Sequence, residues 1–145
     1  MKELDNFVAQ TLPRQSKAEE AIHNGHPELR LAMWSTRDPV TLFGAWGPCK
    51  SGSLEVTRIS RWAASRFSNC TAYRFELVAA DVSGDLAYTV GYEHSTRSVD
   101  GGPVEQSTLR VTHIYRRENG VWKIVHRHGD FMAKDQSPPA QVSVM

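Results

Sequence analysis

Toward its C-terminal end the sequence alternates apolar and polar residues in four successive segments, and this alternation constrains the fold more than any other feature. In the first segment Tyr73, Phe75 and Leu77 alternate with charged residues. A period of two residues is typical of β-strands, whose side chains point in turn to opposite faces. The stretch from Tyr73 to Asp130 therefore predicts four strands.

Turn sequences separate these predicted strands. Ser83-Gly84-Asp85 and Glu118-Asn119-Gly120 combine residues that favour tight turns, whereas residues 99–104 (VDGGPV) form a longer, glycine-rich connection. Strands joined by such short turns pair antiparallel. The sequence therefore predicts an antiparallel meander.

The apolar residues of each strand indicate the face that we expect to line a pocket. These faces hold Leu86, Tyr88, Val90, Tyr92 and His94 on the second strand, Leu109, Val111, His113 and Tyr115 on the third, and Trp122, Ile124, His126, His128 and Asp130 on the fourth. Four histidines thereby share mostly apolar faces. If the opposite face of the third strand lines the pocket, Arg110 and Thr112 replace His113 there.

Helical spacing of apolar residues dominates the N-terminal part. The spacing predicts a helix from Leu4 onward, a kink or split at Pro13, and a helix end at Asn24-Gly25, where glycine favours a stop. His26-Pro27 predicts a new helix start.

A short strand over residues 39–45 and a glycine-rich loop follow, and a third helix is predicted to begin at Gly52 or Ser53. Helices that precede an antiparallel sheet and cover one of its faces indicate an α+β fold.

Length and charge exclude several classes of protein. The chain has 145 residues, which fits one domain, and its 17 Lys and Arg nearly balance 16 interspersed Asp and Glu. This balance argues against nucleic acid or an anionic membrane as a partner. No apolar run approaches the roughly 20 residues of a membrane span, and Met1–Asn6 does not resemble a signal peptide. With only Cys49 and Cys70, far apart, we expect reduced thiols and a cytoplasmic location.

Four segments carry a resemblance to a known family: AIHNGHPELRLAMWS, RDPVTLFGAWGPCKSG, SGDLAYTVGYE and RVTHIYRRENGVWKIVHRHGD. The chain resembles the nuclear transport factor 2-like superfamily, in its SnoaL-like and ketosteroid-isomerase-like branch, from about residue 18 to residue 131. The resemblance implies a cone: a curved, mixed sheet wrapped around about three N-terminal helices, with a pocket for a small, largely apolar molecule. It also implies a homodimer. We expect a single SnoaL-like domain over residues 1–133, and a flexible tail over residues 134–145 because that segment is polar and contains prolines.

The resemblance does not extend to the catalytic set of the steroid isomerases. Alignment places Ala18 at the position of their helix tyrosine, Gly44 at that of their base, and His113 near that of their donor acid. Asp38 comes before the short strand rather than after it, so a turn or helix-capping role is expected for it. The fold also hosts many activities, so it does not determine function.

Acid–base chemistry is one hypothesis that the residues support. His126 and His128 are expected about 6.8 Å apart on one face, with Asp130 continuing it. A carboxylate beside a histidine raises its basicity, which suits proton transfer near neutral pH. Dehydratases of the resembled fold use histidines with tyrosines and a carboxylate, so we predict His113, His128 and Asp130 as catalytic candidates for an isomerase, dehydratase or cyclase.

Binding without chemistry is the other hypothesis, and it is slightly favoured because the isomerase residues are absent. The candidates for contact with a small apolar or polyketide-like molecule are Trp34, Trp46, Trp62, Tyr88, Tyr92, His94 and His126. Trp46 lies on the glycine-rich loop, where no periodicity demands burial. His-x-His spacing suits two metal ligands, but no carboxylate or cysteine extends it, so we expect neither metal nor cofactor. A dimeric scaffold without ligand is a further alternative.

Overall fold

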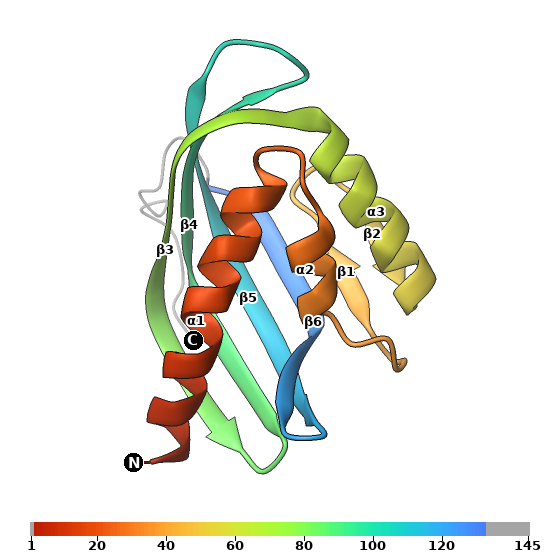
Figure 1. Ribbon diagram of the computed structural model, residues 1–145, viewed down its shortest axis with the longest axis vertical. Helices are drawn as coiled ribbons and strands as arrows, with labels where there is room; N and C mark the ends of the chain where they lie inside the picture. Colours follow the sequence, from red (N-terminus) through yellow and green to blue (C-terminus); the bar gives the residue numbers. More distant parts are fainter. Residues whose placement is uncertain (1, 133–145) are drawn as a thin grey trace, which may run out of the picture.

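A six-stranded mixed sheet forms the back of the molecule in a computed structural model that describes residues 2–132 (Figure 1). The strand order across the sheet is β2-β1-β6-β5-β4-β3. All neighbouring strands pair antiparallel except β1 and β6, which are parallel. The strands are β1 (Thr41–Phe43), β2 (Cys49–Ser51), β3 (Phe67–Ser83), β4 (Leu86–Val99), β5 (Glu105–Glu118) and β6 (Val121–Phe131).

The helices α1 (Glu3–Ile22), α2 (Glu28–Met33) and α3 (Ser53–Arg66) lie on one side of the sheet, which we call the inner face (Figure 1). The predicted α+β fold, with helices first and a meander after them, is confirmed. Both predicted tight turns are present, with Gly84, Asn119 and Gly120 at positive φ. The predicted tail over residues 134–145 lies outside the described residues.

The loop and helix predictions need two corrections. Pro13 does not split the first helix, because α1 runs without a break from Glu3 to Ile22. The missing N–H of proline removes one hydrogen bond, and packing of α1 on the sheet keeps the helix continuous. The glycine-rich loop contains β2, whose three residues are too few to show a periodic pattern.

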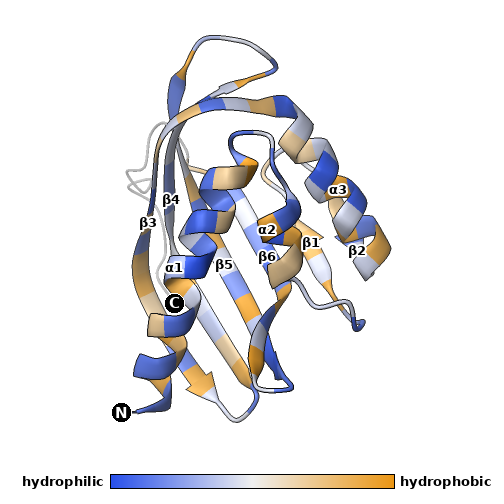
Figure 2. Ribbon diagram, viewed as in Figure 1, coloured by the Kyte–Doolittle hydropathy of each residue, from blue (hydrophilic) through white to orange (hydrophobic). Residues whose placement is uncertain are grey.

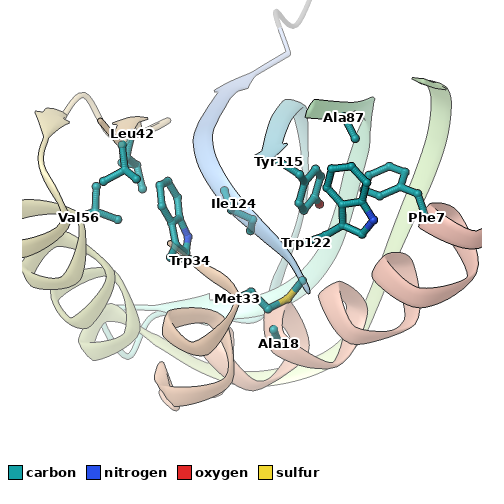
Figure 3. Packing of buried hydrophobic residues seen from close by; sticks show 11 residues of the cluster. Phe7, Ala18, Met33, Trp34, Leu42, Val56, Ala87, Tyr115, Trp122 and Ile124 are labelled. Carbon is teal, nitrogen blue, oxygen red and sulfur yellow. The ribbon is translucent and has the colours of Figure 1, made fainter. Parts of the chain in front are cut away.

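The apolar core begins between α1 and the end of the sheet that holds the two tight turns, and it continues past Trp34 to Leu42 and Val56 (Figure 3). Phe7 packs edge-on against Tyr115 and Trp122, with ring centroids 5.1 Å and 5.2 Å apart (Figure 3). Figure 3 shows Met33 and Ile124 beside this group. In Figure 2 the hydrophobic segments of the strands gather toward this end, whereas the other end of β4 is hydrophilic. The inner face is thus apolar at one end and polar at the other.

The predicted inner face of β4 is wrong. Ala87, Thr89 and Glu93 are buried, whereas Tyr88 on the opposite face is exposed. Cross-strand pairing agrees, since Thr89 lies opposite buried His113. Alternation finds two faces but does not say which one the helices cover, and here the more polar set is inside.

On β5 the inner-face prediction is confirmed, but on β6 it fails halfway along the strand. Between the pairs Ile114–His126 and Tyr115–Ile124 the register shifts, which leaves Val125 as an extra residue in β6. A β-bulge of this kind moves every following side chain to the other face. Ile124 is therefore inside, and after the bulge Arg127 is inside while His126 lies on the outer face.

In residues 2–132 no helix is long and apolar enough to cross a membrane.

Candidate functional site

A cavity of about 80 Å³ opens at the polar end of the inner face, between the sheet, α3 and the loop that joins β1 to β2. Its volume is several times the roughly 10–15 Å³ that a single water needs, so it admits a small molecule. The residues that line it are His23, Arg30, Leu42, Gly44, Ala45, Trp46, Pro48, Ile59, Ser60, Trp62, Ala63, Phe67, Ser95, Arg97, Ser107, Leu109, Arg127 and Phe131.

Aromatic side chains form the outer wall of this cavity. Trp46 packs against Phe67 with ring centroids 4.9 Å apart and meets Trp62 edge-on at 5.7 Å. The guanidinium of Arg66 lies 3.9 Å from the centroid of the Trp46 ring, a cation–π contact. Arg66 also forms a two-pronged ion pair with Asp100. These contacts tie the Trp46 loop to α3 and to the β4–β5 connection.

Beside the cavity, buried ion pairs occupy the polar end of the inner face. Arg127 Nη2 donates to Glu93 Oε1 at 2.8 Å, and Nη1 donates to Oε2 at 3.1 Å. The Tyr73 hydroxyl donates to the same Glu93 carboxylate at 2.8 Å. Arg30 Nε lies 2.9 Å from Glu19 Oε2. We call Glu19, Arg30, Glu93 and Arg127 the ion-pair network, and all four are buried.

The two carboxylates of the ion-pair network titrate in opposite directions. Burial raises the pKa of Glu19, and the negative charge of Glu93 adds to this rise. Burial alone would also raise the pKa of Glu93, but the charge and hydrogen bonds of Arg127 outweigh it and hold the pKa well below its usual range. The network is therefore neutral when both carboxylates are ionised and positive when Glu19 holds a proton.

Two histidines next to the network are neutral near pH 7. Arg127 Nη1 lies 3.2 Å from His113 Nε2, and because arginine only donates, the proton of His113 is on Nδ1. Burial, together with the charge of Arg127, places the pKa of His113 well below 6.5. His23 donates from Nδ1 to the Glu19 carbonyl at 2.6 Å, and burial lowers the pKa of His23 to about 4.

The predicted catalytic residues lie on opposite faces of the sheet. His113 is buried on the inner face, whereas His128 and Asp130 are on the outer face, where Asp130 pairs with Arg110. Thr112 and not His113 is the cross-strand partner of His128. The three side chains therefore do not share one surface.

Only part of the predicted ligand-binding set lines the cavity. Trp46 and Trp62 are in its wall. Trp34 is buried in the apolar core. The others lie on the outer face: Tyr88, Tyr92, His94 and His126. His126 and His128 are neighbours there, as expected, with ring centroids 6.4 Å apart.

Most polar residues of the cavity wall were not among the residues predicted from the sequence. Ser95 and Arg97 belong to the β4 face that looked solvent-facing, and Arg127 follows the Val125 bulge. The sequence does contain one indication of this polar wall. Glu93, Ser95 and Arg97 are spaced two residues apart, so a carboxylate and a guanidinium point to the same face of one strand.

The remaining expectations concern the isomerase positions and metals. Asp38 lies in the bend before β1, and its Oδ1 accepts a hydrogen bond from the Ser53 N–H at the start of α3. The N-cap residue of that helix is Gly52, so Asp38 contacts the helix start from a distant part of the chain. Gly44 lines the cavity and provides no side chain that could act as a base. Within residues 2–132, no group of three His, Cys, Asp or Glu side chains is arranged to hold a metal ion.

A mixed sheet that bends around N-terminal helices and leaves a cavity at one end is the cone of nuclear transport factor 2-like proteins, and solved structures of that class match. A proposed dehydratase of the class from Streptomyces avermitilis matches with a TM-score of 0.72 at 24% identity, over 89% of this chain and 98% of that one. A protein of unknown function in nutrient uptake from Rhodospirillum rubrum matches with a TM-score of 0.66 at 19% identity, over 87% and 98%. A superfamily protein from Salmonella enterica serovar Typhimurium matches with a TM-score of 0.64 at 18% identity, over 90% and 96%.

The sequence identifies one family within the nuclear transport factor 2-like class. Residues 17–134 match the model of the SnoaL-like domain, and the chain belongs to this family. No curated protein is similar enough to the chain to count as a match. At these identities the solved structures establish the fold and not an activity.

Proposed function

We propose that the protein binds a small, largely apolar molecule in the cavity between α3 and the inner face. The observation that carries this proposal is the cavity itself, with an aromatic wall of Trp46, Trp62 and Phe67 and polar groups at its deep end. Concave sites with mostly apolar walls and a few convergent polar groups are the usual form of small-molecule sites.

Acid–base catalysis is the alternative, and the neutral imidazole of His23 in the cavity wall is what favours it. A pKa of about 4 makes this imidazole a weak base near pH 7. Among the described residues, the cavity wall contains no Asp or Glu that could serve as a base instead. Binding without a defined reaction is therefore the better-supported function.

Filling the cavity tests the binding function. Small neutral and charged cyclic compounds are screened for an increase in melting temperature, since a ligand at 100 times its Kd stabilises the folded state by about 2.7 kcal/mol. Ala63→Phe places a ring in the cavity and abolishes the increase, whereas Ser65→Phe on the exposed side of the same helix retains it. If Ala63→Phe responds to a ligand as the wild type does, binding occurs elsewhere.

We further propose that two copies pair through the outer face of the sheet. Large apolar side chains are exposed there, on Phe43, Val78, Leu86, Tyr88 and Ile114. Exposed apolar patches mark interaction sites, and a two-fold axis, the commonest symmetry of soluble oligomers, would bring the same patch of two copies together.

Light scattering after size exclusion measures the predicted dimer. Tyr88→Glu combined with Ile114→Glu is expected to give a monomer, because it places charges at the centre of the apolar patch. Leu54→Glu, at an exposed site on α3, is expected to leave the dimer intact. A wild-type mass equal to one chain contradicts the pairing.

A further inference from the structure

One cation in the cavity wall forms no ion pair among the described residues. Three arginines line the cavity, and two of them, Arg30 and Arg127, are paired with Glu19 and Glu93. Arg97 is only 7% exposed. The carboxylate of Glu105, its cross-strand partner on β5, attracts it, but no carboxylate of the described residues forms an ion pair with it. Its Nε has no hydrogen-bond partner in residues 2–132, and Nη1 makes one long contact of 3.4 Å to the Glu105 carbonyl.

This arrangement is costly unless an anion completes it. A guanidinium stays protonated in proteins, so Arg97 does not escape its burial by losing the charge. Burying a charge without an ion-pair partner is unfavourable. The ion-pair network offers no compensation, since it is neutral or positive. The guanidinium packs instead on the Phe67 ring, 5.6 Å from its centroid.

Hydroxyl groups accompany Arg97 in the cavity wall. Ser60 is fully buried and its Oγ has no partner among the described residues. Ser95 and Ser107 are cross-strand partners next to Arg97 on the inner face. Serine hydroxyls donate hydrogen bonds to an anion and add no negative charge that would repel it.

From these observations we propose that the cavity selects a small monocarboxylate with an apolar body, held by Arg97 with help from the serines. The fork of a guanidinium matches the two oxygens of a carboxylate. Arg97 is the one arginine of the described cavity wall that forms no ion pair, which matches one negative charge, and Trp46, Trp62 and Leu109 match an apolar body. This inference rests on the proposed binding function and specifies its ligand class.

Matched acids and amides test the carboxylate preference in the wild-type protein. Benzoate, cyclohexanecarboxylate and hexanoate are each compared by calorimetry with benzamide, cyclohexanecarboxamide and hexanamide, which have the same shape without the charge. Each acid is expected to bind about tenfold or more tightly than its amide, the factor typical of a charge-assisted hydrogen bond. Added salt is expected to weaken only the acids.

Variants of Arg97 test whether this residue causes the preference for acids over amides. Arg97→Gln is expected to bind acid and amide equally, and Arg97→Lys to keep part of the difference. Arg110→Gln, which removes an exposed arginine of the outer face, keeps the wild-type preference. Where Arg97→Gln does not fold, the acid–amide difference in the wild type and its loss at high salt decide the question.

Each contrary result has its own meaning. Amides that bind as well as acids overturn the carboxylate preference and leave the binding function standing. Inorganic phosphate that competes as strongly as benzoate also overturns it, because the apolar body then contributes nothing. A preference that survives in Arg97→Gln removes Arg97 from the site. If no acid or amide binds, this inference fails, and the wider thermal-shift screen with Ala63→Phe decides the binding function separately.

Discussion

Arg127 on β6 and Glu93 on β4 join through two hydrogen bonds across the intervening strand β5, in the buried interior of the cone. The pair links strands that are not neighbours and lies beside the cavity. Loss of this pair is therefore expected to disturb both the sheet and the adjoining wall of the cavity.

Removing one partner of this pair is expected to destabilise the protein strongly. Arg127→Met leaves Glu93 buried without its cation, at a cost of about 3–5 kcal/mol in the free energy of unfolding. The double variant Glu93→Gln with Arg127→Met is expected to lose less, because it leaves no buried carboxylate without a cation: the charge of Glu93 is removed and Glu19 keeps Arg30. Urea titrations measure all three, and a double variant less stable than Arg127→Met would contradict this account.

Acid is expected to destabilise the protein through His23. An unfolded histidine binds a proton below about pH 6.5, whereas folded His23 binds one only near pH 4. The unfolded state thus binds more protons between these values, so stability falls by up to about 3 kcal/mol as pH falls from 6.5 to 4. His23→Phe should flatten this part of the stability–pH curve, and exposed His26→Asn should not. Equal slopes for wild type and His23→Phe would disprove the assignment.

Gly91 is expected to tolerate no side chain. A Cβ there would lie 2.3 Å from the Glu76 carbonyl oxygen and 2.6 Å from Phe75 Cζ. Gly91→Ala should therefore cost about 1–3 kcal/mol through forced displacement of backbone and ring. At Gly129, two strands away, the atom nearest to an added Cβ would be 3.6 Å from it, so Gly129→Ala should leave the melting temperature close to that of the wild type. Equal melting temperatures for both variants would refute the crowding at Gly91.

Phe7 is expected to anchor α1 on the sheet. Its side chain is fully buried against Tyr115 and Trp122, so Phe7→Ala should lower the free energy of unfolding by about 3–5 kcal/mol. Leu54→Ala, at a side chain 80% exposed, serves as the control. A loss at Phe7 no larger than that at Leu54 would mean that α1 contributes little to the core.

The order of the helices and strands was predictable because local signals determine it. Alternation marked β3 to β6, glycine and asparagine marked the turns, and Pro27 marked the start of α2. Pro13 misled because its local cost is outweighed by packing that only the folded chain provides. Local signals of this kind predict which helices and strands form, and tertiary packing decides where each of them begins and ends.

The candidate site was less predictable because it depends on which face of each strand is turned inward. On β4 the apolar set with Tyr88 and Tyr92 is outside, and Glu93 is inside because Arg127 neutralises it. Such pairing depends on a residue 34 positions away, so no local pattern reveals it. The extra residue at Val125 then reversed the faces of β6 without any glycine or proline to mark it.

The ion-pair network has a consequence for how relatives of this chain diversify. Along α1, Phe7 belongs to the apolar core and Glu19 to the network, and His23, directly after the helix, belongs to the cavity wall. The wall residues Trp46 and Leu109 are not members of the core cluster. Leu42, by contrast, belongs to both the wall and the core. A lineage that exchanges Trp46 or Leu109 can therefore alter the cavity without replacing a core residue, whereas a change at Leu42 alters specificity and stability together.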